Sequence, residues 1–157
     1  MASLIDYCNA IRDGEYSAVE GYIESGKFSV DEDLENDFKP IFMECKYKRH
    51  NIVKLLLEKD KDKTIIRTKN PLTKQNALHY ILTCHTRGYR ADSDELRCVQ
   101  VLLEHGIDIY ESWQNCTAVD IVANRDIKTL SVLFYEHAGM VSLKVYVKSF
   151  MLNNYIF

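Results

Sequence analysis

Glycine and proline are scarce in this chain, with six and two residues among 157. None of the few glycines forms a glycine-rich phosphate-binding loop, and neither serine nor cysteine stands in a nucleophile-elbow sequence. No apolar run approaches the roughly 18 residues of a membrane-spanning helix. The first residues lack a basic segment followed by an apolar one, and position 2 is not the glycine that myristoylation requires. We therefore expect no catalytic residues, no cofactor, no signal peptide and no membrane association.

Strong net charge and paired cysteines are also lacking. Twenty basic residues against 23 acidic ones give a formal net charge of −3 at pH 7, so no general attraction to nucleic acid is expected. The five cysteines are odd in number and have no paired spacing. This usage favours reduced thiols and a cytoplasmic protein, with the nucleus as an alternative.

What the chain does contain is a phrase that is repeated several times. Residues 76–81 (NALHYI) align with 117–122 (TAVDIV), and each phrase precedes an apolar segment that ends in Glu-His, at 101–105 and 132–137. Weaker copies lie upstream, at 40–58 and 10–26. Self-similarity of this kind indicates a repeat architecture. The glutamates that close the four copies lie 34, 46 and 32 residues apart, at Glu24, Glu58, Glu104 and Glu136.

The apolar residues of each copy have helical spacing. Ile52, Val53, Leu56 and Leu57 lie on one face of a helix, and the same pattern returns in the later copies at Val99, Leu102, Leu103, Leu130, Leu133 and Phe134. A single pair of short helices cannot bury such a face, whereas stacking on the next pair can. Gly26 and Gly106 are expected where helices end, and Asp94 is expected to cap the helix that runs to His105.

The period and the phrase resemble those of the ankyrin repeat, whose unit has about 33 residues. The resemblance predicts an all-α solenoid of about four helix-turn-helix repeats, at 2–36, 37–70, 71–112 and 113–138, followed by an apolar cap or tail at 139–157. It implies that His79 is structural and hydrogen-bonds between adjacent turns, rather than acting as a general base. In the third copy, an insertion from Cys84 to Asp92 separates the two helices.

The insertion, the degenerate phrases and the ten tyrosines also resemble the ankyrin proteins of poxviruses. That resemblance implies a protein-interaction module that binds host proteins and modulates host range or innate immune signalling. Many such proteins recruit a ubiquitin ligase through a C-terminal F-box-like segment, but only 19 residues follow the fourth copy here. This departure puts that recruitment in doubt and favours a short or truncated member of the family without the F-box-like segment. The alternative is a cellular ankyrin adaptor similar to the NF-κB inhibitors.

Candidate partner-contacting residues follow from the ankyrin resemblance, because that family binds partners through its turn tips and the exposed face of each first helix. Trp113 could be an interface anchor, or it could fold onto its own turn and shield the stack. The candidates are Arg12, Lys46, Tyr47, Tyr80 and Arg125 on the first helices, Arg87, Tyr89 and Arg90 in the insertion, and Tyr110 and Trp113 in the turn before the fourth copy.

Basic residues are dense between positions 46 and 74, after an acidic stretch at 31–37. Solvated helix and turn surface is the simpler interpretation, and a surface for an acidic partner is the alternative. Nucleic acid is not expected, because aromatic residues are not interleaved as stacking platforms. The strongly apolar residues 150–157 either close the stack or form a patch for a partner or a second copy of the chain.

Two sets of residues superficially match metal sites. Cys84, His85, Cys98 and His105 lack the paired spacing of zinc ligands. The acidic stretch from Asp31 lacks the glycine and glutamate that an EF-hand loop requires at positions 6 and 12. We therefore expect no bound metal.

Overall fold

The computed structural model describes residues 3–34, 38–84 and 91–139. Within these ranges the protein is all-helical, as predicted, and its one extended feature is an isolated bridge between Trp113 and Cys116. The helices are α1 (Leu4–Asp13), α2 (Tyr16–Glu24), α3 (Pro40–Lys46), α4 (His50–Lys59), the short 3₁₀ helix η2 (Ile65–Arg67), α5 (Ala77–Cys84), α6 (Ser93–Glu104), α7 (Ala118–Arg125) and α8 (Lys128–Ala138).

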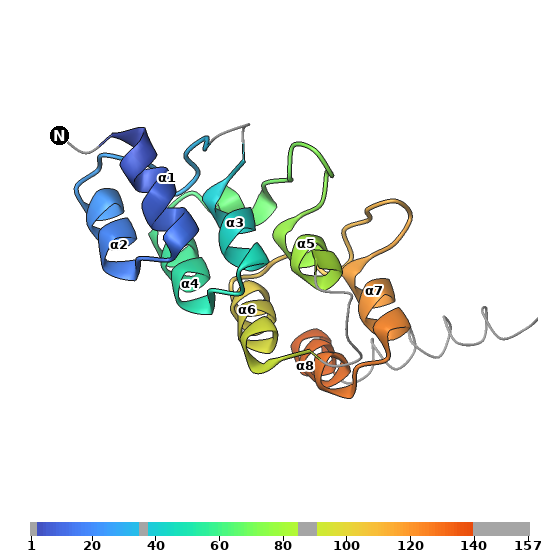
Figure 1. Cartoon of the computed structure of the whole chain (residues 1–157). Helices are drawn as coiled ribbons and strands as arrows, with labels where there is room; N and C mark the ends of the chain where they lie inside the picture. The colour runs from blue at the N-terminus through green and yellow to red at the C-terminus, as the bar shows by residue number, and fades with distance from the viewer. Residues whose placement is uncertain (1–2, 35–37, 85–90, 140–157) are drawn as a thin grey trace, which may run out of the picture.

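The α-helices form consecutive pairs in two layers (Figure 1). Helix α1 packs on α2, α3 on α4, α5 on α6 and α7 on α8. Across the pairs, α1, α3, α5 and α7 contact one another in succession, as do α2, α4, α6 and α8. The connections between pairs extend beyond the helices at the top of Figure 1, and the described turns within pairs lie at the opposite end.

Local chemistry explains where several helices begin. Helix α1 has a capping box between Ser3 and Asp6, and α7 has one between Thr117 and Asp120. In each box the hydroxyl accepts from a backbone N–H of the first turn and the carboxylate accepts from the cap residue. Helix α6 begins earlier than predicted, because Asp92 rather than Asp94 caps it and accepts from the Glu95 N–H at 2.8 Å.

Glycines stand at or just after the ends of four of the described helices, and Gly14 shows why the residue is needed. Gly26 and Gly106 have positive φ angles after α2 and α6, as predicted. Gly14 has φ 76°, and a Cβ atom built there would lie 2.5 Å from the Arg49 Nε. The turn after α1 therefore needs both the left-handed conformation and the missing side chain.

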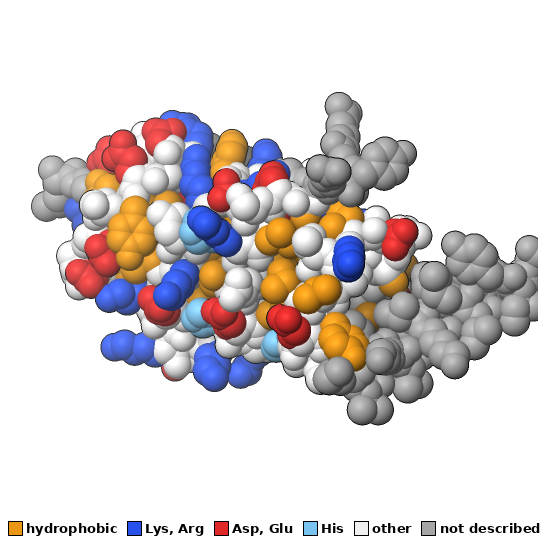
Figure 2. Space-filling model, turned by 90° about the horizontal axis from the view of Figure 1, so that it is seen from below, with side chains coloured by type: hydrophobic (Ala, Val, Ile, Leu, Met, Phe, Trp, Pro, Cys, Tyr) orange, Lys and Arg blue, Asp and Glu red, His pale blue; other side chains and the backbone are white. Residues whose placement is uncertain are grey.

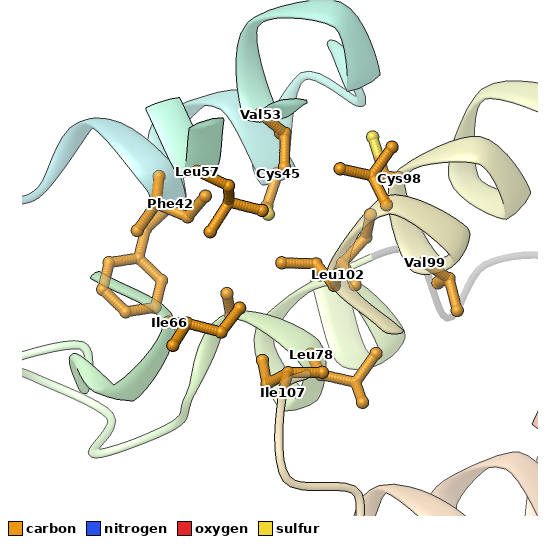
Figure 3. Packing of buried hydrophobic residues seen from close by; sticks show 14 of the residues in the cluster. Phe42, Cys45, Val53, Leu57, Ile66, Leu78, Cys98, Val99, Leu102 and Ile107 are labelled. Carbon is orange, nitrogen blue, oxygen red and sulfur yellow. The ribbon is translucent and has the colours of Figure 1, made fainter. Parts of the chain in front are cut away.

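One continuous apolar core runs between the two layers. Figure 3 shows Phe42, Leu57 and Ile66 on one side of this core and Leu78, Leu102 and Ile107 on the other. The predicted apolar faces are buried except for Leu133, which is half-buried. Each large side chain buried in this way contributes about 1.5–3 kcal/mol, so successive pairs stabilise one another.

Two arginines connect successive pairs with hydrogen bonds. Arg49, just before α4, donates to the carbonyl oxygens of Ile11 and Arg12 at the end of α1, both at 2.7 Å. Arg125, the last residue of α7, donates to the Leu82 carbonyl in α5 at 3.3 Å and pairs with the Glu95 carboxylate. Both arginines thus bind carbonyl oxygens in the last turn of a first helix, where donors from within the helix run out.

The predicted 139–157 segment lies outside the described residues from position 140 onward, as does most of the insertion in the third copy, at 85–90. Among the described residues, no helix has both the length and the apolar character required to cross a membrane.

Candidate functional site

The long connections before α5 and α7 end in ordered tips. In the first, the Asn70 side chain accepts hydrogen bonds from the backbone of Leu72 and Thr73 at 2.9 and 3.1 Å. In the second, Trp113 and Cys116 exchange two backbone hydrogen bonds across a turn in which Gln114 and Asn115 have positive φ. The tips, 71–74 and 113–116, are therefore short turns with a defined backbone.

Side chains tie these two connections together. The Trp113 indole N–H donates to the Thr73 carbonyl oxygen at 2.7 Å. Glu111 reaches back to the earlier connection, with Lys69 Nζ at 2.7 Å and Asn76 Nδ2 at 2.8 Å. The two tips are thus held next to each other as one surface.

Exposed apolar side chains lie on and beside these tips. Tyr110 is 46% exposed, as expected for a contact residue, and Leu72 is 79% exposed. Sequence reasoning did not select Leu72. The available signal was an apolar residue directly after proline in a turn, Pro71-Leu72-Thr73-Lys74, where a water-facing side chain is expected.

Trp113 is half-buried and occupies a structural position between the connections. Its ring lies 6.1 Å from the His79 ring, centroid to centroid, and its N–H is bonded to the preceding connection. It therefore packs on a neighbouring turn, whereas the shielding alternative placed it on its own turn.

His79 is buried, and its ring agrees only in part with the hydrogen bonds that the ankyrin resemblance implies. Neither ring nitrogen makes a hydrogen bond of standard geometry with another described residue, but a backbone contact with Glu111 in the adjacent turn raises the pKa of the ring, as a weak hydrogen bond would. The backbone N–H of His79 instead donates to the Asn76 side chain at 2.8 Å. Burial lowers the pKa of the imidazole, and the nearby Glu111 carboxylate opposes that effect. A neutral ring packed against Trp113 suits a structural role better than proton transfer.

The candidates on the first helices divide into exposed and half-buried residues. Arg12 is exposed and donates to Asn9 Oδ1 at 2.6 Å. Lys46 and Tyr47 are exposed at the end of α3, and the Tyr47 ring has Lys46 Nζ at 5.8 Å and the Arg49 guanidinium at 4.6 Å from its centroid. An exposed ring flanked by two cations can contact an acidic or an apolar group on a partner.

Tyr80 and Arg125 are tied into the fold. Tyr80 packs against Phe38 and Phe42, with centroids 6.2 and 5.5 Å away, and burial raises the pKa of its hydroxyl. The Arg125 side chain is 10% exposed because it pairs with the buried Glu95. Arg87, Tyr89 and Arg90 lie outside the described residues.

Within residues 3–34, 38–84 and 91–139, no three His, Cys, Asp or Glu side chains converge as metal ligands. Cys45 and Cys98 are buried, and burial raises the pKa of both thiols. Such thiols are poor nucleophiles, because the thiolate is the reactive form.

The face formed by the turns within pairs is neither uniformly basic nor uniformly acidic. Figure 2 shows basic and acidic side chains interleaved there with separate apolar patches. The exposed candidates lie in two places, Leu72 and Tyr110 at the tips, and Arg12, Lys46 and Tyr47 where α1 and α3 end, at the turns within pairs.

Comparison with protein-family models, with curated proteins and with solved structures finds no match to this chain.

Proposed function

We propose that this chain is an ankyrin-repeat protein that holds another protein on its turn tips and first helices. The helix pairs in two layers, with the connections between pairs at one end, support the repeat assignment. The observation that carries the function is the exposure of apolar and aromatic side chains at Leu72 and Tyr110 on the tips and at Tyr47 where α3 ends. Tyrosine is enriched at the energetic centres of protein interfaces.

The proposal extends to the kind of partner. The poxvirus resemblance favours a host protein bound in the host cytoplasm, to alter host range or innate immune signalling. The repeated phrase with its long insertion supports this assignment over an NF-κB-inhibitor-like adaptor, because such an inhibitor is expected to have more regular repeats.

Comparative affinity capture from mammalian cells tests the proposal. The wild-type chain is compared with a Tyr47→Ala, Leu72→Ala, Tyr110→Ala variant and with a control, Tyr16→Ala, Val132→Ala, whose exposed residues lie on α2 and α8. We expect a partner that binds directly when the complex is reconstituted from purified components. The control variant should bind this partner like the wild-type chain, and the triple variant should bind it at least tenfold more weakly. Equal capture by all three proteins, with all three folded, would rule out this surface.

A further inference from the structure

The last described helix pair, α7 and α8, leaves part of the core incompletely covered. Five residues before the glutamate that closes each copy lies a side chain that faces the core. In the first three copies it is a valine with no exposed surface, at Val19, Val53 and Val99, and in the fourth it is the half-buried Ser131. Val19 is covered although α1 and α2 are the first pair, so we infer that this position faces the following pair. Among the described residues, no pair follows α8.

Two further positions of the last pair show the same loss of cover. Directly before their closing glutamates, Leu57 and Leu103 are 7% and 4% exposed, whereas Tyr135 is half-buried. Directly after the repeated phrase, Leu82 has no exposed surface, whereas Ala123 is half-buried. Both helices of the last pair are therefore less covered than their equivalents in the preceding pairs.

The open positions define a surface called here the end face, formed by Ala123 on α7 and by Ser131, Tyr135 and Ala138 on α8. The three residues of α8 have the spacing of one helix stripe, and α7 and α8 pack on each other. Only Ser131 is polar and none of the four is charged, whereas a solenoid end that faces water normally has a polar outer surface. The end face therefore has the character of a contact surface.

In the described part of the chain, the connection after a second helix returns to the core. Beyond Gly26, Phe28 packs against the core and Val30 is 9% exposed, while Ser29 between them is exposed. The connection after α6 likewise returns two isoleucines that are almost fully buried. These returning residues cover the side of the pair that the chain has just left.

The sequence beyond α8 has the same arrangement. Gly139 has φ 77°, in the same left-handed range as Gly26 at 68°. The residues that follow it, Met140-Val141-Ser142-Leu143, have apolar side chains at the same distances from the glycine as Phe28 and Val30, with a serine between them. From 140 to 157, 12 of 18 residues are apolar and two are charged. Burying such side chains contributes about 1.5–3 kcal/mol for each large one.

Covalent attachment favours this segment over other occupants of the end face. It begins where α8 ends, so its effective concentration at the end face is on the order of millimolar, which a separate molecule rarely reaches. Eighteen residues extend roughly 27 Å as a helix and up to about 60 Å as an extended chain. The 11 residues of α8 are only about 16 Å long, so the segment is long enough to cross both helices.

We propose that residues 140–157 fold back on the end face and close the stack. Val141 and Leu143 take the places that Phe28 and Val30 take after α2, and the later apolar residues cover the remainder of the face. The end face is then an internal contact surface that a second copy of the chain cannot use. The inference goes beyond the proposed function and does not depend on a partner protein.

Hydrogen exchange of the full chain, followed by mass spectrometry, tests this. Leu143→Asp disrupts the segment, and Ser131→Arg places a charge on the end face. The matched controls are Ser142→Asp, at the position equivalent to an exposed serine, and Thr129→Arg, at an exposed position of α8. We expect the amides of 140–157 to be protected in the wild-type chain, to exchange at least tenfold faster in each test variant and to stay within twofold in each control.

Two results would overturn the proposal. One is exchange of residues 140–157 in the wild-type chain at the rate of an unfolded peptide, and the other is equal acceleration by test variants and controls. Unchanged exchange in α1 to α4 verifies that the variants remain folded. Sedimentation velocity should show a monomer, and a dimer that Ser131→Arg dissociates would assign the end face to a second copy instead. The Tyr47→Ala, Leu72→Ala, Tyr110→Ala variant should exchange like the wild-type chain, so failure of the proposed function would leave this result standing.

Discussion

Two glutamates are buried in this protein to the same extent and are held very differently. Glu44 on α3 is fully buried, and Glu95 on α6 is 1% exposed. Each lies beside an arginine that also binds carbonyl oxygens of a neighbouring first helix. Glu95 meets both terminal nitrogens of Arg125. Glu44 lies 3.6 Å from one nitrogen of Arg49 and makes no hydrogen bond with another described residue.

The difference shows that the geometry of the ion pair, more than burial, decides whether a buried carboxylate keeps its charge. Removing a charge from water costs several kcal/mol, and only a well-placed, hydrogen-bonded partner offsets that cost. Burial raises the pKa of Glu44 to about 8, against the opposing effect of Arg49. Glu44 is therefore mostly protonated at neutral pH, and the Arg49 guanidinium acts chiefly on the carbonyl oxygens of α1.

The largest expected effect comes from breaking the tighter pair. Arg125→Ala leaves Glu95 buried without its cation, which we expect to lower the free energy of unfolding by about 3–5 kcal/mol. Urea denaturation measures the loss, and Arg97→Ala, on the exposed face of α6, is the control. A loss below about 1 kcal/mol would mean that Glu95 finds another partner or loses its charge.

Stability should depend on pH through Glu44. The folded-state pKa of about 8 lies above the ordinary value of 4.5, so between these values the folded protein holds a proton that the unfolded chain has released. This contribution is fully present below about pH 4.5 and is lost as the pH rises to about 8. The loss is on the order of a few kcal/mol, because each pKa unit corresponds to about 1.4 kcal/mol.

Replacing that carboxyl by a neutral group isolates the effect. Glu44→Gln should remove the pH-dependent loss and be more stable than wild type at pH 9, measured by thermal unfolding across the range. Glu95→Gln should instead destabilise the protein near neutral pH, because it weakens the pair with Arg125. Parallel pH profiles for wild type and Glu44→Gln would show that Glu44 keeps its charge in the folded state.

Arg49→Ala should cost less than Arg125→Ala at neutral pH. It removes two hydrogen bonds to the end of α1 but leaves Glu44 protonated, so we expect a loss of about 1–3 kcal/mol. The cost should grow at pH 9, where Glu44 ionises without a partner. Urea denaturation of the wild-type chain and Arg49→Ala at pH 6 and at pH 9 measures this cost. An equal loss of stability at the two pH values would contradict the loose pairing of Glu44 with Arg49.

The smallest expected loss of stability comes from removing the N-terminal cap of α7, the helix that carries Arg125. Thr117→Ala removes the capping box of α7 and should lower stability by about 1 kcal/mol. Ser3→Ala removes the corresponding box of α1 and should cost no more, since that helix end is exposed. A greater loss for Ser3→Ala in urea denaturation would mean that the cap does not support the Glu95 pair.

Sequence reasoning predicted the helical class and the apolar faces because they depend on spacing within one helix. Ile52, Val53 and Leu56 are buried as expected. The cap of α6 was misplaced because Asp92 and Asp94 both precede Glu95, and spacing alone does not distinguish them. Arg125 occupies a helix position that register predicts to be exposed, yet it pairs with a residue 30 positions earlier.

The repeated phrase by itself determined that the chain forms short amphipathic helices in pairs, because hydrophobic periodicity is a local property. Only the tertiary structure decided which charged residues are buried, which arginine meets its glutamate at both nitrogens, and that Trp113 binds the Thr73 carbonyl. These outcomes depend on the distance between atoms from different helix pairs. A shift of about 1 Å separates a charge-assisted hydrogen bond from a weak contact, and residue spacing along the chain does not contain that information.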